Sequence, residues 1–183
     1  MDSFGPLTPS SSPHNVMTAE NRYAAQLSSA GPLWKRWLRE LRWILRRPRG
    51  LGRLGDDACI QLPLRFVNGE CVEIGSRAVI GANCLLQPIR SYLGQRFEPR
   101  LVIGDDCYLG AGCQLHCIER IELGHGCVLS DQVYVSDTGH GLDPRRGLIM
   151  DQPIGSKGPV KIGDGSFVGF GAVLLSGVEL GRH

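Results

Sequence analysis

The sequence predicts an all-β domain in which the chain winds as a parallel β-helix. From residue 72 onward an aliphatic residue recurs every six positions, and a small or compact residue follows it four positions later. A helix would repeat every 3.6 residues and an ordinary strand every 2, so a period of six indicates short strands joined by tight corners. Three six-residue units would complete one coil.

Two positions share this period. The aliphatic position is followed by glycine in every case but one, and it is occupied by Ile74, Ile80, Ile103, Leu109, Leu123, Leu129, Ile162, Val168 and Leu180. The compact position is occupied by Ala78, Cys84, Cys107, Cys113, Cys127, Val133, Ser166, Ala172 and Val178. Both should point inward, because a narrow prism has no room for two bulky side chains at each step. Four cysteines are therefore interpreted as small apolar core residues rather than reactive thiols.

Two segments interrupt the period, at residues 87–100 and 140–159. Insertions in a rigid solenoid are usually loops that project from one corner, where binding and catalysis can be placed without disturbing the coils. The second insertion opens with Gly139-His140-Gly141. It therefore places an imidazole at the junction between a rigid coil and a loop, which suits a catalytic group.

The repeats resemble those of the hexapeptide-repeat acyltransferases. The resemblance rests on "VEIGSRAVIGANCLL", "LVIGDDCYLGAGCQL" and "VKIGDGSFVGFGAVLLSGVELG", and it covers residues 72–183 well and 51–71 weakly. It implies a left-handed superhelix, which the spacing alone does not show. The stretch "VYVSDTGHGLDPRRG" further resembles the active-site segment of the sugar and maltose O-acetyltransferase branch.

On this resemblance His140 is the general base that removes a proton from the acceptor as it attacks a thioester carbonyl. Asp137 is a candidate to orient the imidazole. The alternatives are that His140 is a solvated loop histidine and that Asp137 is a turn residue. Asp143 is interpreted as a turn residue because a proline follows it.

The resemblance also implies acetyl-CoA as donor, bound between neighbouring chains of a homotrimer. The residues implied for donor binding are Phe167, Gly169, Phe170 and Gly171, although family members usually carry an indole in place of Phe167 and a small or polar residue in place of Phe170. Gln114, His116 and Glu119, one coil before the second insertion, are candidates for binding the acceptor. Their alternative interpretation is that of solvated surface residues.

Three segments are expected along the chain: a disordered tail (1–20), an amphipathic helical segment (21–50) and the β-helix (51–183), whose last coil ends within a repeat. Residues 33–47, "LWKRWLRELRWILRR", place tryptophan and aliphatic side chains on one helical face and basic residues on the rest. Such a helix could cap the first coil or lie on an anionic membrane surface.

Composition narrows the function classes. The net charge is only +2, so no general attraction to nucleic acid is expected. Seven cysteines without a C-x-x-C pair argue against a disulfide framework and a zinc ribbon. The sequence shows no secretory signal and no stretch of about 20 apolar residues, so we expect a cytoplasmic protein, with peripheral contact at the inner face of the membrane through residues 33–47 as an addition.

The first functional hypothesis is O-acetylation of a sugar hydroxyl, in surface polysaccharide assembly. The second is N-acetylation of an amino sugar or an antibiotic. A metal hydratase of the γ-carbonic-anhydrase kind is disfavoured, because His116, His125 and His140 lack the close spacing of its three ligands, and no metal is expected. An inactive scaffold is the remaining alternative.

Overall fold

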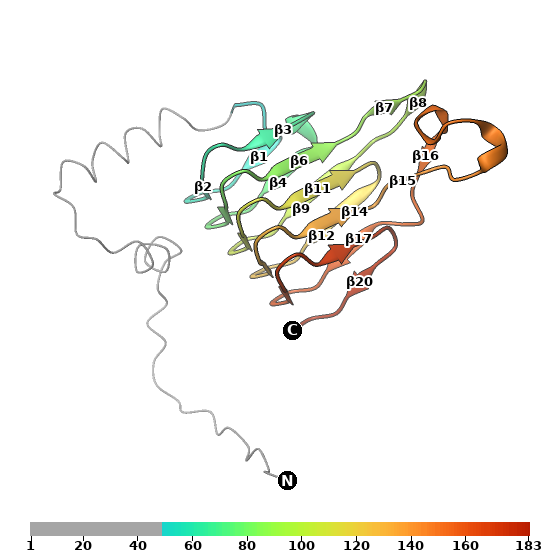
Figure 1. The fold of residues 1–183 in the computed structure, drawn as a ribbon. Coiled ribbons are helices and arrows are strands. Elements are labelled where there is room, and N and C mark those ends of the chain that lie inside the picture. The colour runs from blue at the N-terminus through green and yellow to red at the C-terminus, as the bar shows by residue number, and fades with distance from the viewer. Residues whose placement is uncertain (1–48) are drawn as a thin grey trace, which may run out of the picture.

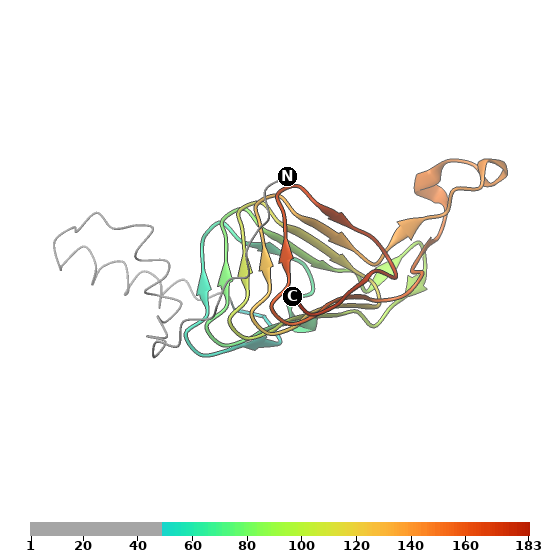
Figure 2. The ribbon, with the colours of Figure 1, turned by 90° about the horizontal axis from the view of Figure 1, so that it is seen from below.

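The computed structural model describes residues 49–183. Within them the chain winds as a parallel β-helix whose coils stack along one axis, from the first coil near residue 53 to the last near residue 180 (Figures 1 and 2). This confirms the all-β prediction. The expected tail (1–20) and the amphipathic stretch 33–47 lie outside the described residues.

Three parallel sheets, here named A, B and C, form the sides of the helix. Sheet A contains β1 (Arg53–Leu54), β4 (Val72–Ile74), β9 (Arg100–Ile103), β12 (Arg120–Leu123), β17 (Val160–Ile162) and β20 (Glu179–Leu180). Sheet B contains β2 (Cys59–Ile60), β5 (Val79–Ile80), β10 (Tyr108–Leu109), β13 (Val128–Leu129) and β18 (Phe167–Val168). Sheet C contains β3 (Arg65–Phe66), β6 (Leu85–Pro88), β11 (Gln114–Cys117), β14 (Tyr134–Ser136) and β19 (Val173–Leu174). A short 3₁₀ helix, η1 (Gly69–Cys71), precedes β4.

The register places equivalent residues of successive coils over one another. Leu109, for example, pairs with Ile80 of the preceding coil and Leu129 of the following one. The predicted inward positions are buried, with exposed fractions of 6% or less up to Val168, and only the last coil leaves Ala172, Val178 and Leu180 partly exposed. The stacking therefore produces one continuous apolar core.

At several corners the glycine that follows the aliphatic residue is needed because an aspartate of the following coil occupies the space beside it. An aspartate of the following coil accepts a hydrogen bond from the backbone of the coil before it, as in Asp105 to Ser76, Asp131 to Ala111 and Asp164 to His125, each at 2.8 Å. A side chain at Gly75, Gly110 or Gly124 would meet that carboxylate. Glycine at these positions leaves space for the aspartate to bind between coils.

None of the seven cysteines, all of which lie within residues 49–183, forms a disulfide. The four that were expected in the core, Cys84, Cys107, Cys113 and Cys127, are buried, which confirms their interpretation as core residues. Cys117, which the repeat left unassigned, is also buried, whereas Cys59 and Cys71 are partly exposed.

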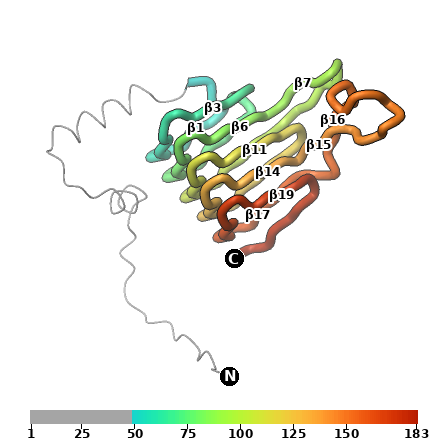
Figure 3. The backbone as a smooth tube through the Cα atoms, viewed as in Figure 1, coloured from blue at the N-terminus to red at the C-terminus, as the bar shows by residue number. Residues whose placement is uncertain are grey.

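The two insertions form antiparallel pairs that project from the same side of the coil stack (Figures 1 and 3). Residues 87–100 contain a hairpin of β7 (Ser91–Tyr92) and β8 (Gln95–Arg96). Its two turn residues, Leu93 and Gly94, both have positive φ, as a type I′ turn requires. Residues 139–155, here named the arm, contain β15 (Gly139–His140), η2 (Pro144–Arg146), η3 (Ile149–Asp151) and β16 (Ile154–Gly155).

No helix within residues 49–183 has the length and apolar content needed to cross a membrane.

Candidate functional site

His140 lies at the base of the arm, four residues after the end of β14. It is exposed, and β15 pairs in antiparallel fashion with β16, so that His140 faces Ile154 and Gly139 faces Gly155. Gly141 donates a backbone hydrogen bond to Pro153 at 2.9 Å. The imidazole is thus held on a two-stranded ribbon at the edge of the coil stack, where the sequence predicted the junction between a rigid coil and a loop.

Gln152 organises the interior of the arm. Its side chain is only 2% exposed, and its Oε1 accepts from the Asp143 backbone at 3.1 Å. Its Nε2 donates to the carbonyls of Asp143 at 2.9 Å and Gly147 at 3.2 Å. Asp143 caps η2 by accepting from the backbone of Arg145, in agreement with its interpretation as a turn residue. Gln152 could not be recognised from the sequence, because no repeat or motif marks it.

The hairpin supports the arm from outside. The Tyr92 hydroxyl donates to the carbonyl of Met150 at 2.6 Å, and the Gln95 side-chain amide binds both backbone groups of Ile154 at 2.9 Å. The Tyr92 ring meets the His140 ring edge to face, with centroids 5.5 Å apart. Tyr92 and Gln95 could not be recognised from the sequence either, since their hydrogen bonds join positions 58 and 59 residues apart along the chain.

Asp137 lies inside the coil stack and is fully buried. Its Oδ1 accepts from the backbone N–H of Ile118 at 2.7 Å, and its Oδ2 accepts from those of Glu119 and Arg120 at 2.9 and 2.7 Å. The Cys117 thiol donates to Oδ2 at 3.5 Å. The carboxylate thus stabilises the bend between β11 and β12, and its hydrogen bonds are with this bend rather than with His140. A role in orienting the imidazole stays a prediction.

The three predicted acceptor residues lie on the same coil but not in one cluster. Gln114 and His116 point outward from β11, with Gln114 Oε1 and His116 Nε2 at 3.4 Å, and the His116 ring lies against Tyr134 at 5.2 Å between centroids. Burial lowers the pKa of His116. Glu119 is exposed in the bend that Asp137 holds.

The predicted donor residues lie in the coil that follows the arm. Phe167 is on β18 in sheet B, and Gly169, Phe170 and Gly171 form the corner that leads to β19 in sheet C. Phe167 and Phe170 are 70% and 68% exposed. Val173 and Leu175 beyond the corner are also exposed. These four apolar side chains are here named the last-coil patch.

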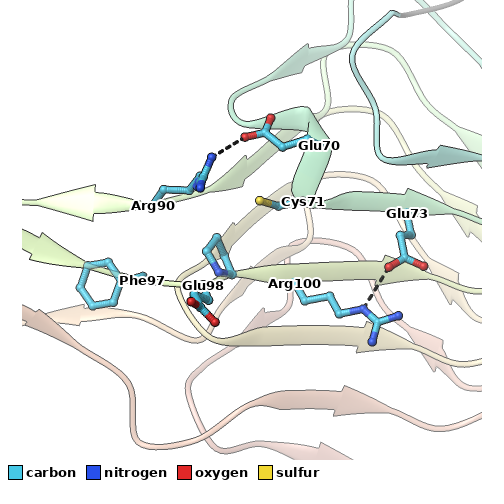
Figure 4. Close-up of a pocket in the computed structure, with 8 residues that line it drawn as sticks. Glu70, Cys71, Glu73, Arg90, Phe97, Glu98 and Arg100 are labelled. Atoms are coloured by element: carbon cyan, nitrogen blue, oxygen red, sulfur yellow. Dashed lines mark hydrogen bonds and ion pairs between the residues drawn. The ribbon is translucent and has the colours of Figure 1, made fainter.

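A hollow of about 430 Å³ lies beside the base of the hairpin, where it faces η1 (Figure 4). Arg90 pairs with Glu70 and Arg100 with Glu73, each at 3.0 Å, so the charges across the hollow are largely paired with one another. All four side chains are at least 31% exposed, and such pairs contribute little to stability. The hollow therefore marks where the hairpin base is joined to the preceding coil.

Within residues 49–183 no group of three or more His, Cys, Asp or Glu side chains lies so that it could hold one metal ion.

Comparison with known proteins agrees with this fold. Residues 100–136 and 159–183 match the family model described as the hexapeptide repeat of succinyl-transferase. A probable acetyltransferase of Mycobacterium tuberculosis is 29% identical over 154 residues, which are 80% of this chain and 46% of that protein. Nodulation protein L of Rhizobium meliloti is 27% identical over 160 residues, 86% of this chain and 63% of that protein. The chain thus spans about half to two thirds of the length of these relatives.

Among solved structures, AntD, an N-acyltransferase from Bacillus cereus crystallised with dTDP and 3-hydroxybutyryl-CoA, superposes with a TM-score of 0.57 at 18% identity. The match covers 78% of this chain and 70% of that one. The parallel sheets, the six-residue repeat and these matches confirm the predicted left-handed parallel β-helix. Together they show that the chain is similar to hexapeptide-repeat proteins, among them a probable acetyltransferase.

Proposed function

We propose that this chain transfers an acetyl group from acetyl-CoA to a hydroxyl group of a sugar, with His140 as general base, as in the sugar and maltose O-acetyltransferase branch. The observation that carries the proposal is the exposed imidazole of His140, held on the β15–β16 ribbon where the arm leaves the coil stack. The names of the relatives, which include a probable acetyltransferase, support the same class of reaction. Surface polysaccharide assembly is the process we propose for it.

In the proposed reaction the neutral imidazole of His140 accepts the proton of the acceptor hydroxyl as its oxygen attacks the thioester carbonyl. The tetrahedral intermediate then collapses, the C–S bond breaks, and the CoA thiolate takes the proton from His140. A backbone N–H would stabilise the oxyanion. We place the donor against Phe167, Gly169, Phe170 and Gly171, and the acceptor near Gln114, His116 and Glu119.

An amine acceptor is the second candidate. AntD is named an N-acyltransferase and has also been crystallised with dTDP-4-amino-4,6-dideoxyglucose and coenzyme A. The same base could take a proton from an amine as its nitrogen attacks the thioester carbonyl, so the acceptor alone distinguishes the two reactions. A panel that contains both sugars and amino sugars therefore decides between them.

A homotrimer would bring the proposed base, His140, of one chain close to the proposed donor residues of a neighbouring chain. In one chain the arm leaves after sheet C, whereas the proposed donor residues lie on β18 in sheet B and the corner that follows. The arm exposes Leu142, Leu148, Ile149 and Met150, each at least 51% exposed, and the last-coil patch exposes apolar side chains on other faces. Two different apolar surfaces on one chain suit a head-to-tail interface that closes into a ring.

The amphipathic stretch 33–47 is proposed either to cover the first coil or to make peripheral contact with the inner face of the membrane. Co-sedimentation of the full chain with anionic vesicles tests this contact. Binding that disappears when residues 1–48 are removed would support the membrane role, and no binding to vesicles would contradict it.

The central test follows thiol release from acetyl-CoA against a panel of sugars and amino sugars. The native chain should release CoA only with a suitable acceptor, and His140→Ala should abolish this release while His125→Ala, a change at another exposed histidine, should preserve it. Equal release from the native chain and His140→Ala would remove His140 as the base. A chain that binds no acetyl-CoA would support the inactive scaffold instead.

A further inference from the structure

The ribbon that carries His140 is a two-stranded sheet, so neither of its edges is paired with another strand. Gly141 donates to Pro153, and the next residue pair along the ribbon, His140 and Ile154, is therefore a non-hydrogen-bonded pair, in which side chains lie closest together. The N–H and C=O of Ile154 consequently point away from β15. On a two-stranded ribbon these groups would be left to solvent, and such ribbons are only marginally stable by themselves.

Gln95 binds both of these groups. Its Nε2 donates to the carbonyl of Ile154 and its Oε1 accepts from the N–H of Ile154, both at 2.9 Å. A single side-chain amide thus supplies the pair of hydrogen bonds that a third strand would supply. The residue it holds is the one opposite His140.

Tyr92 lies directly opposite Gln95 in the hairpin, across the two-residue turn. Its hydroxyl binds the Met150 carbonyl in η3, and its ring contacts the imidazole itself with the planes 80° apart. Edge-to-face ring pairs are favourable by about 0.5 to 1.5 kcal/mol, so this contact favours the observed orientation of the imidazole. The hairpin therefore contacts the arm at three points: the imidazole of His140, the backbone of Ile154 opposite it, and the carbonyl of Met150 in η3.

We propose that the hairpin at residues 91–96 positions the imidazole of His140, with Tyr92 and Gln95 as positioning residues. This inference rests on the proposed function of His140 as base. Acyl transfer requires the imidazole within hydrogen-bond reach of the acceptor, and a displacement of about 1 Å can lower a rate about 100-fold. The hairpin insertion is thereby a component of the active site, although neither residue touches the acceptor in this role.

The kinetic test compares Gln95→Met, Tyr92→Leu and Tyr92→Phe with Arg96→Met, a control of similar size on the same hairpin. Gln95→Met and Tyr92→Leu should each lower kcat at least about tenfold. The KM for acetyl-CoA should stay within about twofold, because the proposed donor residues lie in a different coil. Tyr92→Phe keeps the ring contact and should recover most of the kcat lost in Tyr92→Leu. A matching loss in Arg96→Met, or a parent-like kcat in both Gln95→Met and Tyr92→Leu, would overturn the proposal.

A second measurement does not depend on activity. The His140 ring protons, assigned in NMR spectra by their absence in His140→Ala, should shift in Tyr92→Leu and return toward the parent position in Tyr92→Phe. The Ile154 amide should lose protection from hydrogen exchange in Gln95→Met but not in Arg96→Met. If the native chain transfers no acyl group yet both signatures appear, the proposed function fails and the positioning stands. If neither the shift of the His140 ring protons nor the loss of Ile154 protection is seen, the proposed positioning role of the hairpin is contradicted, whatever activity the chain has.

Discussion

Asp137 is a buried charge whose partners are almost all backbone. Its two oxygens accept from the N–H groups of Ile118, Glu119 and Arg120. In Asp137→Asn an amide NH₂ would face donors in place of one oxygen, leaving buried N–H groups unpaired. We expect a loss of about 2 to 4 kcal/mol in the free energy of unfolding, measured by urea denaturation.

The matched control for this change is Asp131→Asn, at an exposed aspartate that accepts one backbone hydrogen bond, from Ala111. It should cost less than about 1.5 kcal/mol. Equal losses in the two variants would show that burial of Asp137 adds nothing to its hydrogen bonds. If Asp137→Asn keeps the stability of the parent but loses activity, and the KM for the acceptor is unchanged, the predicted role of Asp137 in orienting His140 would be supported.

His116 links stability to pH. Burial lowers its pKa, so the unfolded chain binds a proton more readily than the folded chain between the lowered pKa and the ordinary value near 6.5. The free energy of unfolding is therefore not reduced by His116 above the ordinary pKa, and it falls as the pH drops from that value toward the lowered pKa of the folded chain. His116→Gln should show a smaller fall in unfolding free energy between about pH 7.5 and 5 than the parent. Parallel pH profiles for the two proteins would rule out this linkage.

At the scale of the element, one pair of variants tests why glycine follows the aliphatic residue at the corners. Gly110 and Gly169 follow equivalent residues of sheet B, but a Cβ at Gly110 would meet Asp131 of the next coil, whereas one at Gly169 would meet nothing within 4 Å. Gly110→Ala should therefore lose about 1 to 3 kcal/mol, and Gly169→Ala should unfold at the parent's urea concentration. Equal effects would mean that backbone freedom, rather than space for Asp131, selects glycine here.

The elements that could be predicted from the sequence are those that repeat. The inward residues of each coil are fixed by a local period of six, so the core, including Cys107 and Leu109, follows from spacing alone. The contacts of Tyr92, Gln95 and Gln152 could not be predicted, because they join two non-repeating insertions 58 or 59 residues apart or lie within one of them. The position of His140 was predictable from its motif, but the residues that hold it were not.

At the scale of the whole molecule, the buried cysteines report how the coils open. Cys84 lies in the second coil, Cys107, Cys113 and Cys117 in the third, and Cys127 in the fourth, and all are 1% exposed or less. Burial also raises the pKa of Cys117, which removes the reactive thiolate. In the native protein iodoacetamide should therefore modify only the partly exposed Cys59 and Cys71.

In a solenoid each coil contacts only its neighbours, so the outer coils should open before the inner ones. In urea below the unfolding midpoint, pulsed alkylation read by mass spectrometry should label Cys84 and Cys127 before the three thiols of the third coil. Asp137 in the fourth coil joins that coil to the third through its hydrogen bonds, so Asp137→Asn should speed the labelling of Cys117 more than that of Cys84. Labelling of all five buried cysteines at one rate would instead show that the coil stack unfolds as a single cooperative unit.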